Sequence, residues 1–157
     1  MNSVVGGASE RPPREIVIRT VEEDQLVEML RVWSESGLPA RPRGRDAIEN
    51  LRIQRKAAPD LFLAAFEGDR MVGVVLASDD GRKGWINRLA VVPGARRRRV
   101  GRSLVEACEA ALRRRGRGIF CIMIEGENAA SETLFQDMDY KRENDIVYYA
   151  KRESQDL

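Results

Sequence analysis

Four consecutive arginines stand between a predicted strand and a predicted helix, where they could bind phosphate. They are Arg96, Arg97, Arg98 and Arg99, and Gly101 follows them. A helix begins with backbone N–H groups that have no partner in the helix, and its dipole places partial positive charge there. Such a position binds phosphate well, and four guanidinium groups raise the local positive potential further. We therefore expect a phosphate-bearing ligand at residues 96–101.

The residues on either side of the arginines predict the two elements that would position them. Residues 85–92 are rich in β-branched and aromatic side chains, which favours a strand. After the arginines, apolar side chains recur at every fourth position and form one helix face: Val100, Leu104, Cys108 and Leu112. The predicted strand, turn and helix together span residues 85–115.

Composition limits the chemistry that this chain can perform. It has 157 residues, of which 43% are hydrophobic, so a single domain with a substantial core is expected. The chain contains no histidine, which excludes histidine as base, nucleophile or metal ligand. Cys108 and Cys121 are isolated thiols, which predict buried packing residues rather than a disulfide framework or a zinc site. The net charge of +2 argues against a dedicated nucleic-acid binder.

The termini and the absence of long apolar runs set the expected domain boundaries and location. Residues 1–14 contain Gly-Gly and Pro-Pro pairs and are expected to form a flexible leader. Residues 15–152 would then form one domain, and residues 153–157 a short tail. No apolar run approaches the roughly 20 residues that span a bilayer, and no signal peptide is visible. We expect a soluble, cytoplasmic protein without membrane contact.

Apolar periodicity and turn residues predict an alternation of strands and helices. Strands are expected at residues 16–19, 61–67, 71–78, 85–92, 119–124, 140–143 and 146–151. Helices are expected at residues 26–36, 46–56, 100–115 and from Asn128 or Ser131 to Met138. Thr20 and Glu23 have the spacing of a capping box, and Gly68-Asp69 fits a two-residue hairpin turn. Residues 119–124 are continuously apolar, which predicts a buried strand beside a parallel neighbour.

Three segments, together with this element order, resemble one known family. They are residues 89–93 (LAVVP), 96–104 (RRRRVGRSL) and 128–140 (NAASETLFQDMDY). Over residues 16–151 the chain resembles the GNAT superfamily of acetyl-CoA-dependent N-acetyltransferases, whose turn has the form R/Q-x-x-G-x-G/A. Residues 79–85 (DDGRKGW) also look like small bacterial acetyltransferases of the YpeA type. The resemblance implies a mixed α/β (α+β) fold. Its mostly antiparallel sheet would have six or seven strands, a splayed parallel pair at the centre and about four helices.

The resemblance also implies acetyl-CoA as cosubstrate, without a metal, and assigns contacts to it. The backbone amides of the turn would hold the pyrophosphate. The strand at residues 89–91 would splay from residues 119–124 and admit pantetheine, and an N–H near Leu89 or Val91 would polarise the thioester carbonyl. Asn128 would contact the pantetheine arm. The implied cofactor-binding residues are Leu89, Ala90, Val91, Arg96, Arg97, Arg98, Arg99, Val100, Gly101, Arg102, Asn128 and Phe135.

Three positions depart from the family pattern. Arg99 occupies the place of the inner glycine, where a positive φ would cost a side chain about 1–2 kcal/mol. The alternative is an ordinary backbone from which Arg99 reaches a phosphate directly. Phe135 stands where the family often has a tyrosine that protonates the leaving thiolate, although a thiol pKa of about 8.5 already makes thiolate a fair leaving group. Asp139 replaces the usual glycine before Tyr140.

The implied reaction moves an acetyl group to a primary amine, of a small molecule or a peptide, by direct attack in a ternary complex. It requires alignment, oxyanion stabilisation and a base. Without histidine, the base must be a carboxylate, a tyrosine or a water chain. Glu125 and Glu127, which follow the splayed strand, rank first, and Asp79 and Asp80 rank next. The alternative is that all four are solvated surface carboxylates.

Other functions and partners stay open in the sequence. Phe135 and Arg99 also fit a catalytically weak domain that binds CoA or acyl-CoA. Residues 96–99 and 113–117 could bind nucleic acid, but they lie at opposite ends of one predicted helix without interleaved aromatic residues, which argues against this partner. Trp33 and the arginines of residues 41–45 hint at an anionic acceptor amine, with an exposed basic loop as the alternative. The sequence leaves open whether the chain is a monomer or a homodimer.

Overall fold

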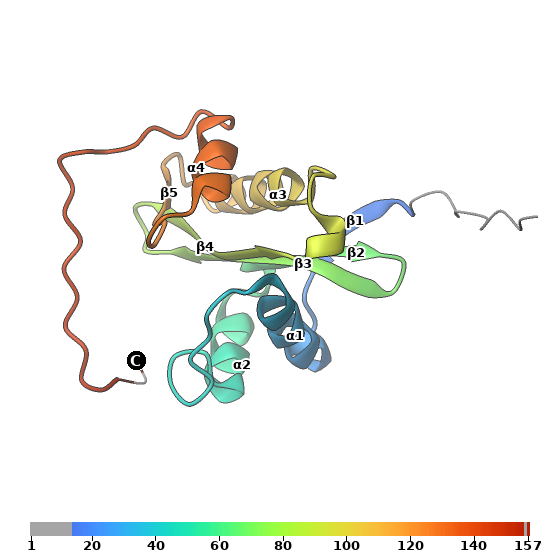
Figure 1. The fold of residues 1–157 in the computed structure, drawn as a ribbon. Helices are drawn as coiled ribbons and strands as arrows, with labels where there is room; N and C mark the ends of the chain where they lie inside the picture. The colour runs from blue at the N-terminus through green and yellow to red at the C-terminus, as the bar shows by residue number, and fades with distance from the viewer. Residues whose placement is uncertain (1–13, 156) are drawn as a thin grey trace, which may run out of the picture.

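The computed structural model describes residues 14–155 and 157, which form one five-stranded sheet with helices on both faces (Figure 1). The strands lie in chain order: β1 (Ile16–Thr20), β2 (Phe62–Glu67), β3 (Arg70–Asp79), β4 (Gly84–Val91) and β5 (Phe120–Ile122). The first four are antiparallel, and β5 runs parallel to β4. The two-residue turn predicted at Gly68-Asp69 is confirmed, because Glu67 pairs with Arg70.

Four α-helices cover the sheet, as predicted. On one face lie α1 (Leu26–Ser36) and α2 (Ile48–Ala57), and on the other lie α3 (Val100–Arg114) and α4 (Ala129–Gln136) (Figure 1). Short 3₁₀ turns are η1 (Glu23–Gln25), η2 (Pro59–Leu61) and η3 (Pro93–Ala95). The capping box predicted at Thr20 and Glu23 is wrong. Thr20 stays in β1, where it pairs with Leu63, and Glu22 N instead donates to Gln25 Oε1 at 3.0 Å.

The start of α3 is held close to β3 by a glycine. A Cβ added at Gly73 would lie 3.0 Å from both Leu104 Cδ1 and Val100 Cγ1, so a larger residue would require these two side chains to shift. Leu104 and Leu112 on α3 and Trp33 on α1 are fully buried on the two faces of the sheet. This packing fixes the helix start, and with it the arginine turn, against the rigid centre of the fold.

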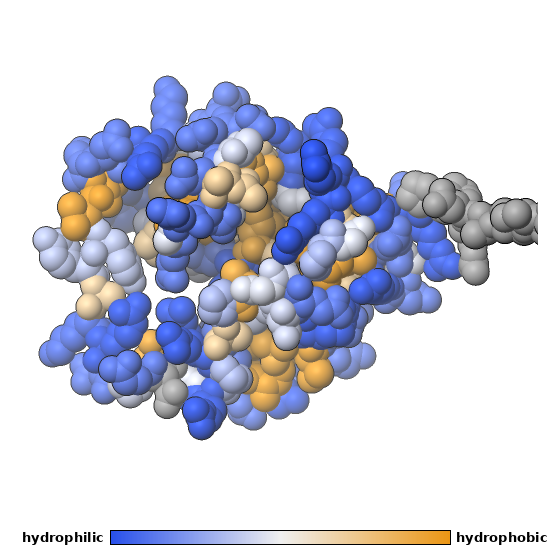
Figure 2. Space-filling view, viewed as in Figure 1, coloured by the Kyte–Doolittle hydropathy of each residue, from blue (hydrophilic) through white to orange (hydrophobic). Residues whose placement is uncertain are grey.

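The prediction of two strands after the last helix is wrong. Residues 140–143 and 146–151 form no strand, and the chain leaves the body after α4 (Figures 1 and 2). Tyr149 is accordingly 88% exposed. The parallel pair therefore lies at the edge of a five-stranded sheet rather than at its centre. β5 is also shorter and less buried than predicted, with Ile119 and Met123 exposed at its ends, because no strand among the described residues pairs with its outer side.

The predicted leader lies outside the described residues, except for Arg14. None of the helices in the described part of the chain is long and apolar enough to cross a bilayer.

Candidate cofactor site

The arginine turn alternates between backbone conformations. Arg97 and Arg99 both have φ of 61°, whereas Arg96 is extended with φ of −66° and Arg98 is not among the positive-φ residues. Left-handed residues within a turn can direct successive N–H groups toward one side, which is a geometry suited to an anion. The positive φ predicted for Arg99 as one of two alternatives is confirmed. A non-glycine residue in this left-handed region costs about 1–2 kcal/mol.

The N–H groups of residues 97–102 have no acceptor among the described residues. Before this stretch, Arg96 N donates to Pro93 O at 3.2 Å, and after it Ser103 N donates to Arg99 O at 3.0 Å. No side chain caps the start of α3. The helix has 15 residues, so its dipole adds partial positive charge at the same place. The main chain can therefore receive an anion here, as the sequence predicts.

The four arginines do not have equal roles. Arg96 donates from Nε to Val91 O (3.2 Å) and from Nη2 to Ser36 O (3.0 Å), which joins the turn to α1. Arg98 pairs with Glu67 Oε1 on β2 at 2.9 Å and holds the pKa of that carboxyl below its ordinary value. Arg97 and Arg99 are exposed, and their guanidinium groups contact no acceptor in the described part of the chain.

The next residues of α3 connect the turn to α4. The side chain of Val100 is buried in the core, so this residue can offer only its N–H to a ligand. A Cβ added at Gly101 would lie 3.3 Å from Leu134 Cδ2, which shows how closely α4 packs here. Arg102 donates from Nη2 to Asp137 O at 3.1 Å, just beyond the end of α4.

The second half of β4 has an open edge. Pairing between β4 and β5 ends at Ile86 and Ile122, whereas β4 continues to Val91. Val92 N donates to Val72 O at 2.9 Å on the β3 side. Since N–H directions alternate along a regular strand, the N–H group of Val91 points away from β3, toward the open edge. This arrangement agrees with the splayed pair that the sequence resemblance implies.

A bulge with an arginine interrupts β4 beside this edge. Arg88 has φ of 55°, and the β3–β4 register shifts between Val74 and Leu76. The Arg88 guanidinium stacks over the Trp33 ring at 4.1 Å, and Nη2 lies 3.3 Å from Oδ2 of the buried Asp46. Burial lowers the pKa of Arg88 from its ordinary value. Nothing in the sequence marks this bulge, because no glycine occupies it.

The four candidate bases differ in whether their carboxylates already bind other groups of the protein. Asp80 accepts from Trp85 Nε1 at 2.9 Å and from two backbone N–H groups, and these bonds, with Trp85 first, lower its pKa to about 2. Asp79 Oδ1 lies 3.1 Å from Arg117 Nε. Both aspartates therefore stabilise the turn between β3 and β4. Glu125 and Glu127 are exposed in the segment after β5, and the charge of Glu125 acts on Arg88.

Residues around α4 are mainly structural. Asn128 Oδ1 accepts from Ser131 N at 3.1 Å and caps the helix, so Asn128 is the correct one of the two predicted starts. Its amide nitrogen has no hydrogen bond to another described residue. Phe135 is only 6% exposed and packs edge-on against Tyr140, with ring centroids 5.1 Å apart. The Tyr140 hydroxyl donates to Glu109 Oε1 at 2.8 Å, and burial followed by this bond raises its pKa. Asp139 has φ of 65°, which explains why glycine suits this position.

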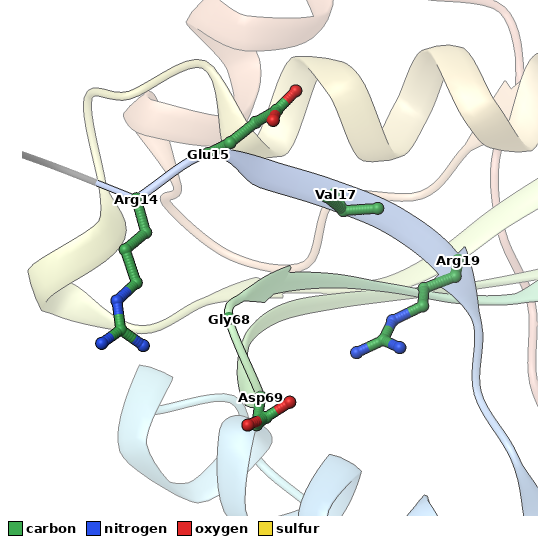
Figure 3. A pocket seen from close by; sticks show the side chains of 6 residues that line it. All are labelled: Arg14, Glu15, Val17, Arg19, Gly68 and Asp69. Carbon is green, nitrogen blue, oxygen red and sulfur yellow. The ribbon is translucent and has the colours of Figure 1, made fainter.

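A separate depression lies at the start of β1, away from the open edge of β4 (Figure 3). Its volume is about 410 Å³, and it is lined by Arg14, Glu15, Val17, Arg19, Gly68 and Asp69. Its charged side chains are of mixed sign and stand apart around an open rim (Figure 3). It therefore offers less to an anion than the main-chain N–H groups of the turn. No cluster of potential metal ligands is present among the described residues.

Comparison with known proteins agrees with this geometry. An acetyltransferase of Yersinia pestis (strain Pestoides F) is 30% identical over 132 residues, which cover 83% of this chain and 91% of the relative. The PaiA N-acetyltransferase of Thermoplasma acidophilum, solved with coenzyme A, superposes with a TM-score of 0.71 at 20% identity, covering 83% of this chain and 92% of that one. AAC(6')-Iy, solved with the bisubstrate analogue CoA-S-monomethyl-acetylneamine, gives a TM-score of 0.73 at 19% identity, covering 88% and 99%.

A family model described as the acetyltransferase (GNAT) family matches residues 19–140, from the end of β1 to Tyr140, shortly after the end of α4. This match includes the arginine turn, the open edge of β4 and the whole of α3. The two solved structures support the same fold. The chain therefore belongs to the GNAT family of acetyltransferases.

Proposed function

We propose that residues 96–102 bind the pyrophosphate of acetyl-CoA and that the chain transfers the acetyl group to a primary amine. The observation that supports this most is the run of N–H groups at residues 97–102, at the positive end of α3, which have no acceptor among the described residues. Pyrophosphate presents several anionic oxygens that can accept from several such donors at once. Acetyl-CoA is the cosubstrate, and the main chain supplies most of its pyrophosphate contacts.

The open edge of β4 would hold the pantetheine arm. The arm would lie beside residues 87–91 as an additional strand, because no strand in the described part of the chain pairs with these residues on the β5 side. The N–H group of Val91 points to this side, so it can donate to the thioester carbonyl oxygen as negative charge develops on it; Leu89, next to the bulge at Arg88, is the other donor that the sequence resemblance implies. Ala90 would contribute only backbone beside them. Asn128, at the start of α4, would contact the arm with its free amide nitrogen.

The amine would attack the thioester carbonyl carbon directly. The C–S bond breaks, the CoA thiolate leaves, and the proton of the attacking amine passes to a base, for which Glu125 and Glu127 are our candidates. Cys108 is unsuited to carry the acetyl group, because it is fully buried and burial raises its pKa to about 12. Phe135 cannot protonate the thiolate, which would take its proton from water.

A small-molecule amine is the acceptor class that we favour over a peptide. AAC(6')-Iy, a neighbour in fold, was solved with an analogue that joins CoA to acetylneamine, an amine-bearing small molecule. Trp33, which the sequence resemblance places near the acceptor, is fully buried beneath Arg88 and so does not contribute to this choice. The comparison supports the class of acceptor and leaves its identity to a screen.

The test combines binding with turnover. Acetyl-CoA should raise the melting temperature, and thiol should be released when an amine panel is added. No thermal shift at millimolar acetyl-CoA would refute the proposal. A shift without thiol release on a broad panel would favour the second candidate, a weakly catalytic CoA-binding domain, which the absence of a hydroxyl at Phe135 supports.

The proposed base and the direct attack need their own variants. Glu125→Gln and Glu127→Gln should lower kcat, whereas the control Glu49→Gln, on the exposed side of α2, should leave it unchanged. Initial rates at varied acetyl-CoA and amine should give intersecting lines. Parallel lines that depend on Cys121, the more exposed cysteine, would contradict direct attack.

A further inference from the structure

We propose that the guanidinium groups of Arg97 and Arg99 bind the 3′-phosphate of CoA, so that the chain discriminates CoA from donors without this phosphate. This inference rests on the proposed function. It assigns a separate role to two side chains, whereas the pyrophosphate is assigned to main-chain N–H groups. It therefore concerns which donors the site accepts rather than how the acetyl group is transferred.

The first argument is the division of the four arginines. Arg96 is occupied by two carbonyl oxygens, of Val91 and Ser36, and Arg98 by the carboxylate of Glu67. Moving either of them to a ligand would break contacts that hold the turn against α1 and β2. Arg97 and Arg99 have no such contact within the described residues and are exposed. Of the four, these two can turn to a phosphate without loss of a protein contact.

The second argument is where these two side chains are attached. Arg97 and Arg99 are the two positive-φ residues of the turn, and both belong to the run of residues whose N–H groups would hold the pyrophosphate. In CoA the ribose that carries the 3′-phosphate is joined to the pyrophosphate through a single methylene group. A long arginine side chain that starts beside the pyrophosphate can therefore reach this second phosphate.

The third argument is the chemistry of the two phosphates. A phosphate monoester carries a charge of about −1.5 to −2 at pH 7 and presents three acceptor oxygens. Guanidinium groups match such oxygens with paired, charge-assisted hydrogen bonds, whereas isolated main-chain N–H groups have no net charge. The monoester is thus the part of CoA that gains most from two free arginines.

Binding measurements with CoA and with dephospho-CoA, which lacks only the 3′-phosphate, test the inference. The wild-type chain should bind CoA tighter by about tenfold or more, which corresponds to about 1.4 kcal/mol. The double variant Arg97→Gly, Arg99→Gly should lose most of this preference while keeping its affinity for dephospho-CoA. Glycine accepts the positive φ at both positions, so this variant should fold. The control Arg82→Gln, Arg114→Gln removes the same charge from two exposed sites and should keep the preference.

The outcomes separate this inference from the proposed function. If the wild-type chain binds both ligands equally, or the double variant keeps the preference, the inference is wrong while CoA binding stands. If the control loses the preference as well, general electrostatic attraction is the cause and the inference is again wrong. If the wild-type chain binds neither ligand, the proposed function fails together with it.

Discussion

Replacing Arg99 by glycine should make this protein more stable, although it removes a side chain from a conspicuous motif. Arg99 has φ of 61° and ψ of 12°, a left-handed conformation that costs a non-glycine residue about 1–2 kcal/mol. Glycine returns about 0.5–1 kcal/mol of this as additional entropy of the unfolded chain. The exposed Arg99 side chain has no partner among the described residues, so we expect a net gain of about 0.5–1 kcal/mol.

The neighbouring residue provides a matched control with the opposite sign. Arg98 has no positive φ, and its guanidinium contacts Glu67 Oε1 at 2.9 Å and Arg14 O at 3.3 Å. Arg98→Gly therefore relieves no strain, adds about 0.5–1 kcal/mol of unfolded-state entropy and removes these contacts as well. Both variants lose one positive charge, so net charge cannot explain a difference between them.

Calorimetry or urea unfolding of the two variants at neutral pH measures the difference. A domain of this size shifts its melting temperature by roughly 2–4 °C per kcal/mol, so Arg99→Gly should rise by roughly 1–4 °C and Arg98→Gly should fall. Equal decreases in the two variants would show that Arg99 is not strained. The left-handed conformation of Arg99, and the anion site inferred from the backbone of this turn, would then be wrong.

Three other predictions follow from the packing and the ion pairs. Gly84→Ala should destabilise by about 1–3 kcal/mol in urea unfolding, since the new Cβ would lie 2.4 Å from Leu112 Cδ1; an unchanged midpoint would contradict this contact. Arg115 lowers the pKa of Asp60 from its ordinary 3.8, so this pair stabilises the fold above that pH. Stability should therefore fall more steeply in wild type than in Asp60→Asn below about pH 4, and identical acid profiles would exclude the effect. Trypsin should remove segment 141–155 long before it cleaves the body, whereas resistance would favour the hairpin predicted from sequence.

Local patterns in the sequence predict most of the fold around the site. The hairpin at Gly68-Asp69 forms because a two-residue turn fixes the register of its own strands. The fourfold apolar repeat predicts α3, since this face alone can pack on the sheet. Asn128 caps α4 through a bond to a residue three positions away. In each case the partners are close in sequence.

The parts that could not be predicted depend on distant partners. Arg98 meets Glu67, which lies 31 residues earlier, and Arg96 meets Ser36, which lies 60 residues earlier. The sequence RRRR alone therefore does not show which of the four arginines bind other parts of the protein and which do not. The exposure of β5 was mispredicted for a similar reason. A continuous apolar run shows what a strand can bury, but whether another strand covers it depends on a segment elsewhere in the chain.

At positions 97 and 99 the backbone conformation favours glycine, but the sequence has arginine. This mismatch links the stability of the free protein to CoA binding. Arginine is a poor choice for a left-handed residue, yet it occupies both positive-φ positions of the turn, and no contact among the described residues compensates it. Strain of this kind persists where function requires the residue. If Arg97 and Arg99 bind a phosphate of CoA, glycine at these positions must raise the melting temperature of the free protein and weaken CoA binding at once. A purely structural role would move both quantities in the same direction, because a damaged turn would also bind CoA less well.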